Sequence, residues 1–120
     1  MVIYPRSIEN RRVMISFAQN GEDVLIDRVF RKSTGFFIDV GAFLPAGSSV
    51  TKYFSIEGWR GINIEPDSAA FAELQRDRPN EINLPCAVGR SRGRTTFYHL
   101  PDTGLSTTSP EQLALLGAGD

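Results

Sequence analysis

Residues 35–42 read Gly-Phe-Phe-Ile-Asp-Val-Gly-Ala, and residues 61–66 read Gly-Ile-Asn-Ile-Glu-Pro. Each is a short apolar run of strand-forming residues that ends in an acidic residue beside a glycine or a proline. A continuous apolar run is typical of a parallel strand buried on both faces. In open α/β sheets, ligands bind at the carboxyl ends of such strands. The two runs therefore predict a small-molecule crevice with two carboxylates, Asp39 and Glu65, at its rim.

The composition is that of one ordinary domain, with 120 residues of which 41% are hydrophobic and 22% are charged. A net charge of −1 gives no support for nucleic acid or an anionic membrane as partner. No run approaches the roughly 18 apolar residues of a membrane span, and the N-terminus lacks a signal-peptide core. One cysteine, Cys86, and one histidine, His99, can form neither an internal disulfide nor a zinc site. We therefore expect a cytoplasmic protein without a metal site.

The order of the expected elements indicates an α/β fold. Residues 1–19 show no clean periodicity and are expected to form an N-terminal arm, followed by the domain at residues 20–120. A first helix is expected from residue 20 or 21 to about 32, and a second begins after a cap at Ser48 or Ser49. A third is expected from Pro66-Asp67 to Pro79, and a weak one at 112–116. Strands are expected at 36–40, 61–65, 82–88 and 94–100. Because Pro85 cannot donate to a ladder, the third strand belongs at a sheet edge. This predicts a parallel sheet of order 3-2-1 with helices on both faces.

Gly41 directly follows the first strand, where the absence of a Cβ lets the backbone approach a ligand. The loop at 41–47 contains neither G-x-G-x-x-G nor the Gly-Lys-Ser/Thr of a P-loop. A pyrophosphate would be poorly held there. A ligand with an adenosine and an amino-acid end, such as S-adenosylmethionine (SAM), fits better. The alternative for Gly41 is a plain turn between strand and helix.

Three further residues are candidates for the same crevice. Glu65 stands where an acceptor would hold ribose hydroxyls, in charge-assisted bonds worth about 1.5–3 kcal/mol each; the alternative is a solvated carboxylate before a helix. Asp39 could receive a ligand's ammonium group or hold the loop backbone. Ala87 ends the third strand, where an adenine could lie against small apolar residues, or it is an ordinary strand end.

Other polar residues have simpler explanations. Helix capping accounts for Asn20, Glu22 and Asp23 without any function. His99 is interpreted as a strand surface residue rather than a general base. The arginines at positions 90, 92 and 94 are interpreted as a solvated turn.

Taken together, the ordered motifs resemble the FkbM family of SAM-dependent methyltransferases. The resemblance runs from about residue 16 to residue 108. It is carried by segments 16–23, 35–43, 49–51, 58–66, 78–79, 82–84 and 104–107. The ordered series is far more specific than any one of these motifs.

The resemblance implies a Rossmann-like fold in which Asp39 and Gly41 line the SAM pocket and Glu65 binds the ribose. Their neighbours Ala42 and Pro66 are expected in the same pocket. It further implies that Gln19 and Asp23 lie near the site and that Ala87 or Val88 borders the adenine. Members of the family methylate hydroxyl oxygens of sugars, polysaccharide precursors or macrolides. The implied partner is thus a small-molecule or glycan acceptor.

The sequence departs from the family in one respect, because the family's domain continues with a fourth strand that ends in an acidic motif. We therefore expect an N-terminal half-domain, truncated before that strand, with an open and association-prone edge on its first strand. Self-association or a complementing C-terminal half would cover it. The alternatives to an O-methyltransferase are an inactive SAM-binding remnant, half of a split enzyme, and, disfavoured by the missing glycines, an NAD-dependent oxidoreductase. The residues identify no catalytic base.

Overall fold

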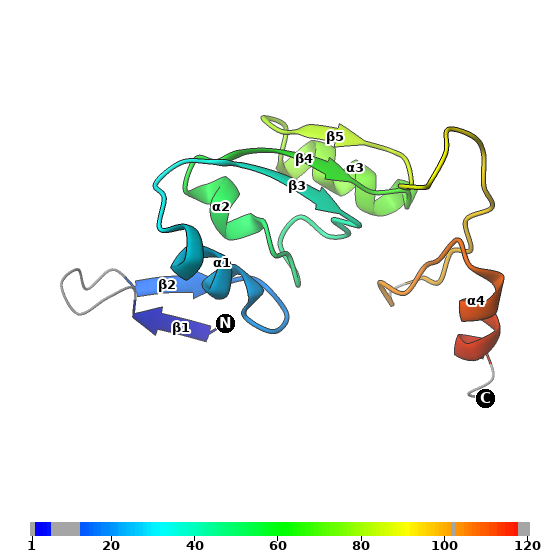
Figure 1. The fold of residues 1–120 in the computed structure, drawn as a ribbon, viewed down its shortest axis with the longest axis horizontal. Coiled ribbons are helices and arrows are strands. Elements are labelled where there is room, and N and C mark those ends of the chain that lie inside the picture. The colour runs from blue at the N-terminus through cyan, green and yellow to red at the C-terminus, as the bar shows by residue number, and fades with distance from the viewer. Residues whose placement is uncertain (1, 6–12, 102, 118–120) are drawn as a thin grey trace.

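The structure, a computed structural model, describes residues 2–5, 13–101 and 103–117 (Figure 1). Its strands are β1 (Val2–Pro5), β2 (Val13–Ser16), β3 (Phe36–Val40), β4 (Arg60–Ile64) and β5 (Ile82–Leu84). Its helices are α1 (Glu22–Phe30), α2 (Lys52–Ile56), α3 (Ser68–Asp77) and α4 (Pro110–Gly117). Strands β1 and β2 form an antiparallel pair, and β3, β4 and β5 form a parallel sheet in that order. The expected α/β architecture with a three-stranded parallel sheet is confirmed.

The parallel sheet follows from the apolar runs. Ile38 of β3 lies opposite Ile62 of β4, which in turn lies opposite Ile82 of β5. Strand β5 is at an edge and ends before Pro85, earlier than the expected limit at residue 88, because proline has no N–H for the ladder. The carboxyl ends of the three strands thus meet at one edge of the sheet.

Helices α2 and α3 lie on the same face of this sheet. Asp39 of β3 accepts a hydrogen bond from Thr51, the residue before α2. Phe37, also on β3, packs beneath Arg78, the residue that follows α3. The alternate side chains of β3, at Phe36, Ile38 and Val40, point to the other face and are 57–61% exposed.

The expectation of helices on both faces is therefore wrong for the described part of the chain. A strand that is apolar on both sides indicates that both sides favour burial. It does not indicate which segments of the chain provide the cover.

The segment expected as an arm contributes to the core. It contains β1 and β2, and residues 1 and 6–12 lie outside the described part. Met14 on β2 is 3% exposed and packs with Val24, Tyr53 and Phe54. Hydrophobic packing thus joins β2, α1 and α2 into one cluster on the helix-covered side of the sheet.

The chain after β5 extends away from the sheet (Figure 1). The expected strand at 94–100 is absent from the described residues; two backbone hydrogen bonds of 2.8 and 3.1 Å join Tyr98 to Thr107 instead. Helix α4 forms where the weak helix was expected, but none of its residues is buried. The radius of gyration is 16.2 Å, above the roughly 14 Å of a compact domain of this length. The segment after β5, which extends away from the sheet, contributes to this excess.

Candidate active site at the carboxyl edge of the sheet

Two neighbouring hollows lie at the carboxyl edge of the parallel sheet. The smaller, of about 100 Å³, includes Phe43, Glu65, Asp67 and Gly104 in its lining. The larger, of about 250 Å³, includes Val40, Ile64, Cys86, Ala87, Val88, Thr107 and Thr108. Both are also lined by Gly41, Pro66, Phe97 and Ser106. Because they share these four residues, we treat the two hollows as one crevice, called here the carboxyl-edge crevice.

Glu65 is the acidic residue of this crevice and is 5% exposed. Its Oε2 accepts a 2.8 Å hydrogen bond from the backbone N–H of Phe43, and its Oε1 accepts a 2.7 Å bond from that of Asp67. One carboxylate therefore holds the loop after β3 and the start of α3 together. An ionised carboxylate has about four acceptor positions, so two bonds do not exhaust its capacity.

Gly41 has φ of +74°, in the left-handed region that favours glycine. Its N–H donates to the carbonyl oxygen of Ile64 at 2.8 Å, and the N–H of Ala42 donates to the same oxygen at 3.2 Å. A Cβ placed on Gly41 would meet no atom within 4 Å. The N–H groups of the turn thus donate to β4, while the absence of a side chain on Gly41 leaves open space beside the crevice.

A segment far along the chain closes one side of the crevice. Phe97 and Ser106 line both hollows, and the Nδ1 atom of His99 pairs with Oδ2 of Asp67. Asp67 also caps α3, because its Oδ1 accepts from the N–H groups of Ala69 and Ala70 at 2.9 Å each. Sequence reasoning missed the place of the 97–107 segment. In the sequence, only the Gly-Leu-Ser-Thr motif at 104–107 could have indicated that this segment lies at the crevice.

Four of the eight predicted site residues line the crevice: Gly41, Glu65, Pro66 and Ala87. The other four, Asp39, Ala42, Gln19 and Asp23, line neither hollow. Ala42 is buried and Gln19 is exposed. Asp23, with no exposed surface, accepts hydrogen bonds from Ser16 Oγ and the N–H groups of Phe17, Ala18 and Val24. The contacts of Asp23 are those of a residue that joins β2 to α1.

Asp39 belongs to a polar network under the sheet rather than to the lining of the crevice. Its Oδ2 accepts a 2.6 Å bond from the hydroxyl of Thr51, and that oxygen accepts two 3.1 Å bonds from Arg78. Arg78 also pairs with Glu81 at 2.8 Å, with both side chains at most 4% exposed. This network fixes the start of α2 against the end of α3.

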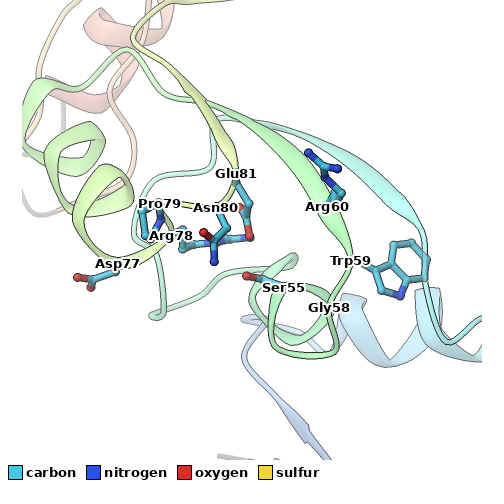
Figure 2. A pocket seen from close by; sticks show the side chains of 9 residues that line it. All are labelled: Ser55, Gly58, Trp59, Arg60, Asp77, Arg78, Pro79, Asn80 and Glu81. Atoms are coloured by element: carbon cyan, nitrogen blue, oxygen red, sulfur yellow. The ribbon is translucent and has the colours of Figure 1, made fainter.

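A larger cavity of about 480 Å³ lies at the opposite, amino-terminal edge of the sheet (Figure 2). Its lining includes Trp59 and Arg60 at the start of β4, and Arg78, Asn80 and Glu81 before β5. The Nη atoms of Arg78 donate to Thr51 and Glu81, whereas its buried Nε has no hydrogen-bond partner among the described residues. Ligands of parallel α/β sheets bind at the carboxyl edge instead. Size alone therefore does not make this cavity the candidate site.

The residues that the structure describes contain no group of three or more His, Cys, Asp or Glu side chains placed to hold a metal ion. None of their helices is long and apolar enough to cross a membrane.

The fold defines a small α/β protein with a crevice at the carboxyl edge of a parallel sheet. A family model described as the methyltransferase FkbM domain matches residues 39–116. The match covers more than half of the chain and includes every residue that lines the carboxyl-edge crevice. The chain belongs to the FkbM methyltransferase domain family, as the sequence motifs predicted. Searches among curated proteins and among solved structures found no match.

Proposed function

We propose that this chain binds SAM in the carboxyl-edge crevice and takes part in methyl transfer to a hydroxyl oxygen of a small molecule or glycan. Membership of the FkbM family supports methyltransferase activity. The observation that carries the proposal is that Gly41 and Glu65, predicted separately from the sequence, line the same hollow. We further propose a cytoplasmic location, on the ground of the single cysteine.

The residues present fit the chemistry of this cofactor. Glu65 is an acceptor with spare positions for hydroxyl donors. Ala87 and Val88 offer a small apolar surface for a base. None of the described residues that line the crevice is a lysine or an arginine, which favours a ligand without phosphates. Each hollow alone is smaller than the roughly 300 Å³ of a typical ligand pocket, so the ligand would occupy both.

When bound, SAM supplies an electrophilic methyl group on a sulfonium sulfur. The chain's own contribution would be to position the ligand, because a bound and oriented reactant reacts much faster than a free one. Glu65 would accept from the ribose hydroxyls, and the missing Cβ of Gly41 would leave room for the rest of the ligand. A base must also accept the hydroxyl proton, and we assign no residue to this role.

Binding of S-adenosylhomocysteine, measured by isothermal titration calorimetry, tests the proposal. We expect binding of this ligand and none of NAD. Ala87→Trp should abolish binding, because the indole would fill the larger hollow. Ala114→Trp is the matched control, since Ala114 is exposed on α4 and lines neither hollow. A folded wild-type protein that binds NAD instead, or neither ligand, would contradict the proposal.

A second titration concerns Glu65. Glu65→Ala should weaken binding about tenfold, which corresponds to about 1.4 kcal/mol. Circular dichroism on the same sample would establish that the variant is folded. Unchanged affinity in a folded variant would remove Glu65 from the site. Binding of S-adenosylhomocysteine without methyl transfer to any hydroxyl acceptor would favour a binding remnant over an enzyme.

A further inference from the structure

The loop that follows β5 carries positive charge with no acidic residue beside it. Residues 89–96, here called the arginine loop, contain arginines at positions 90, 92 and 94, and residues 82–101 include no Asp or Glu. All three arginines are exposed, and none of them forms an ion pair with another described residue. The two arginines at the end of α3, by contrast, each pair with a nearby acidic residue. A surface that only has to be soluble mixes charges of both signs, whereas a patch of one sign attracts an oppositely charged ligand.

The arginine loop begins and ends at the carboxyl-edge crevice. Val88, directly before it, lines the larger hollow, and Phe97, directly after it, lines both hollows. Because each residue extends the chain by at most about 3.6 Å, the Cα of Arg90 lies within about 7 Å of that of Val88. By the same measure the Cα of Arg94 lies within about 11 Å of that of Phe97. Figure 1 shows this segment, in yellow, beyond the carboxyl ends of the strands. The arginines therefore lie near the rim of the crevice.

The position of this charge separates two ligands. The described residues that line the crevice include no lysine or arginine, so the positive charge lies outside the part of the site assigned to SAM. Methyl transfer needs a second reactant, which must enter the crevice from its rim. A guanidinium group donates two parallel hydrogen bonds to a phosphate or a carboxylate. The charge at the rim is thus placed to select the acceptor rather than the cofactor.

We propose that the arginine loop binds an anionic group, a phosphate or a carboxylate, on the methyl acceptor, which makes the acceptor an anionic sugar or glycan. This inference rests on the proposed function, because it names the class of acceptor for the same site. The loop would hold the anionic end of the acceptor at the rim while a hydroxyl of the same molecule reaches the crevice. Nucleic acid fits less well, because it normally engages more cations than three arginines supply and the net charge of the chain is −1.

Nuclear magnetic resonance titrations of the full, isotope-labelled chain test the proposal, with S-adenosylhomocysteine present. Glucose 6-phosphate supplies the phosphate, glucuronate supplies the carboxylate, and glucose is the neutral control. We expect the amide signals of the arginine loop to shift with an anionic sugar and to stay in place with glucose. The stronger of the two responses identifies the anionic group that the loop prefers. Added salt should weaken the response, because the charges are exposed.

Two triple variants locate the response. The first removes the charge of the arginine loop: Arg90→Gln, Arg92→Gln and Arg94→Gln. It should bind the anionic sugar about tenfold more weakly, through the loss of charged hydrogen bonds. Its affinity for S-adenosylhomocysteine should not change, because none of the three arginines lines either hollow. The matched control removes the same charge from exposed residues at and after the end of α1: Arg28→Gln, Arg31→Gln and Lys32→Gln.

The control variant should bind the anionic sugar as the wild type does. Circular dichroism would establish that both variants are folded, and Arg92→Gln alone replaces the first variant if that variant is not. An unresponsive arginine loop in a chain that binds S-adenosylhomocysteine would overturn the proposal and leave the proposed function intact. Equal losses in both triple variants would mean non-specific attraction, and preference for a single-stranded RNA oligonucleotide over both sugars would mean a different partner. Either result would also overturn the proposal. Absence of S-adenosylhomocysteine binding would contradict the proposed function, and with it the acceptor role of the loop.

Discussion

Glu65 at the end of β4 accepts a 2.8 Å hydrogen bond from the backbone N–H of Phe43, which lies in the loop that follows β3. The same carboxylate accepts from the N–H of Asp67 at 2.7 Å. A residue predicted to bind a ribose is thus also the structural link between two loops of the crevice. Under the proposed function, ligand binding and the order of these loops would be coupled through this one side chain.

Glu65→Ala should lower the free energy of unfolding even without ligand. The substitution leaves the buried N–H of Asp67 without its acceptor, which costs about 1–3 kcal/mol. Urea denaturation followed by circular dichroism measures this loss. Glu73→Ala on α3 serves as control, because Glu73 lines neither hollow. Equal midpoints for wild type and Glu65→Ala would show that the carboxylate does not support the loops.

Arg78→Met should be among the most destabilising single changes in the chain. It leaves Glu81, whose side chain is 4% exposed, as a buried charge without its partner, and breaking such a pair costs about 3–5 kcal/mol. The comparison is Arg76→Met, two residues earlier. Arg76 pairs with Asp77 at 2.8 Å, but its side chain is 68% exposed, so no measurable loss is expected. Similar denaturation curves for the two variants would contradict a supporting role for the buried network.

Substitutions at Asp67 separate its two roles. Asp67→Asn should be close to wild type in stability, because asparagine also caps a helix and an ion pair with the half-exposed His99 contributes little. Asp67→Ala removes the cap of α3 and should cost about 0.5–2 kcal/mol. Thermal unfolding of the two variants makes the comparison. If Asp67→Asn is as unstable as Asp67→Ala, the contact with His99 is more important than the cap.

Glu22 should contribute to stability in a pH-dependent way. Hydrogen bonds from its own backbone N–H, and from the backbone and side chain of Asn20, lower the pKa of Glu22 from its ordinary value of 4.5. A carboxyl group whose pKa is lowered on folding stabilises the folded state at pH values above its ordinary pKa. This contribution is lost as the pH falls through the folded-state pKa. Glu22→Gln should therefore lower the melting temperature at neutral pH. The difference should vanish in strong acid, and a difference of equal size at both pH values would rule out this linkage.

Much of the sheet and part of the site could be predicted from short stretches of sequence. The apolar runs at 36–40 and 61–65 predicted β3 and β4 to within one residue, because a buried parallel strand needs apolar side chains on both faces. Gly41 and Glu65 could be placed together because the carboxyl ends of parallel strands meet at one edge. Helix α3 followed from Asp67 as cap and Pro79 as terminator.

The roles of Asp39 and Arg78 could not be predicted, because they depend on contacts between residues distant in sequence. Asp39 matches the family motif. Its partner Thr51, and Arg78, which donates to Thr51, come from other parts of the chain. His99 was predicted to be a strand surface residue, whereas in the structure it pairs with Asp67.

The sequence by itself determined the local elements, the parallel direction of the strands and the edge where a ligand site belongs. These properties depend on side-chain periodicity and on residues next to one another in the chain. Only the tertiary structure decided which face of the sheet α2 and α3 cover, which acidic residues line the crevice and which segment closes it. The physical reason is that an apolar pattern encodes a preference for burial, whereas the partner in that burial is set by packing between segments far apart in the chain.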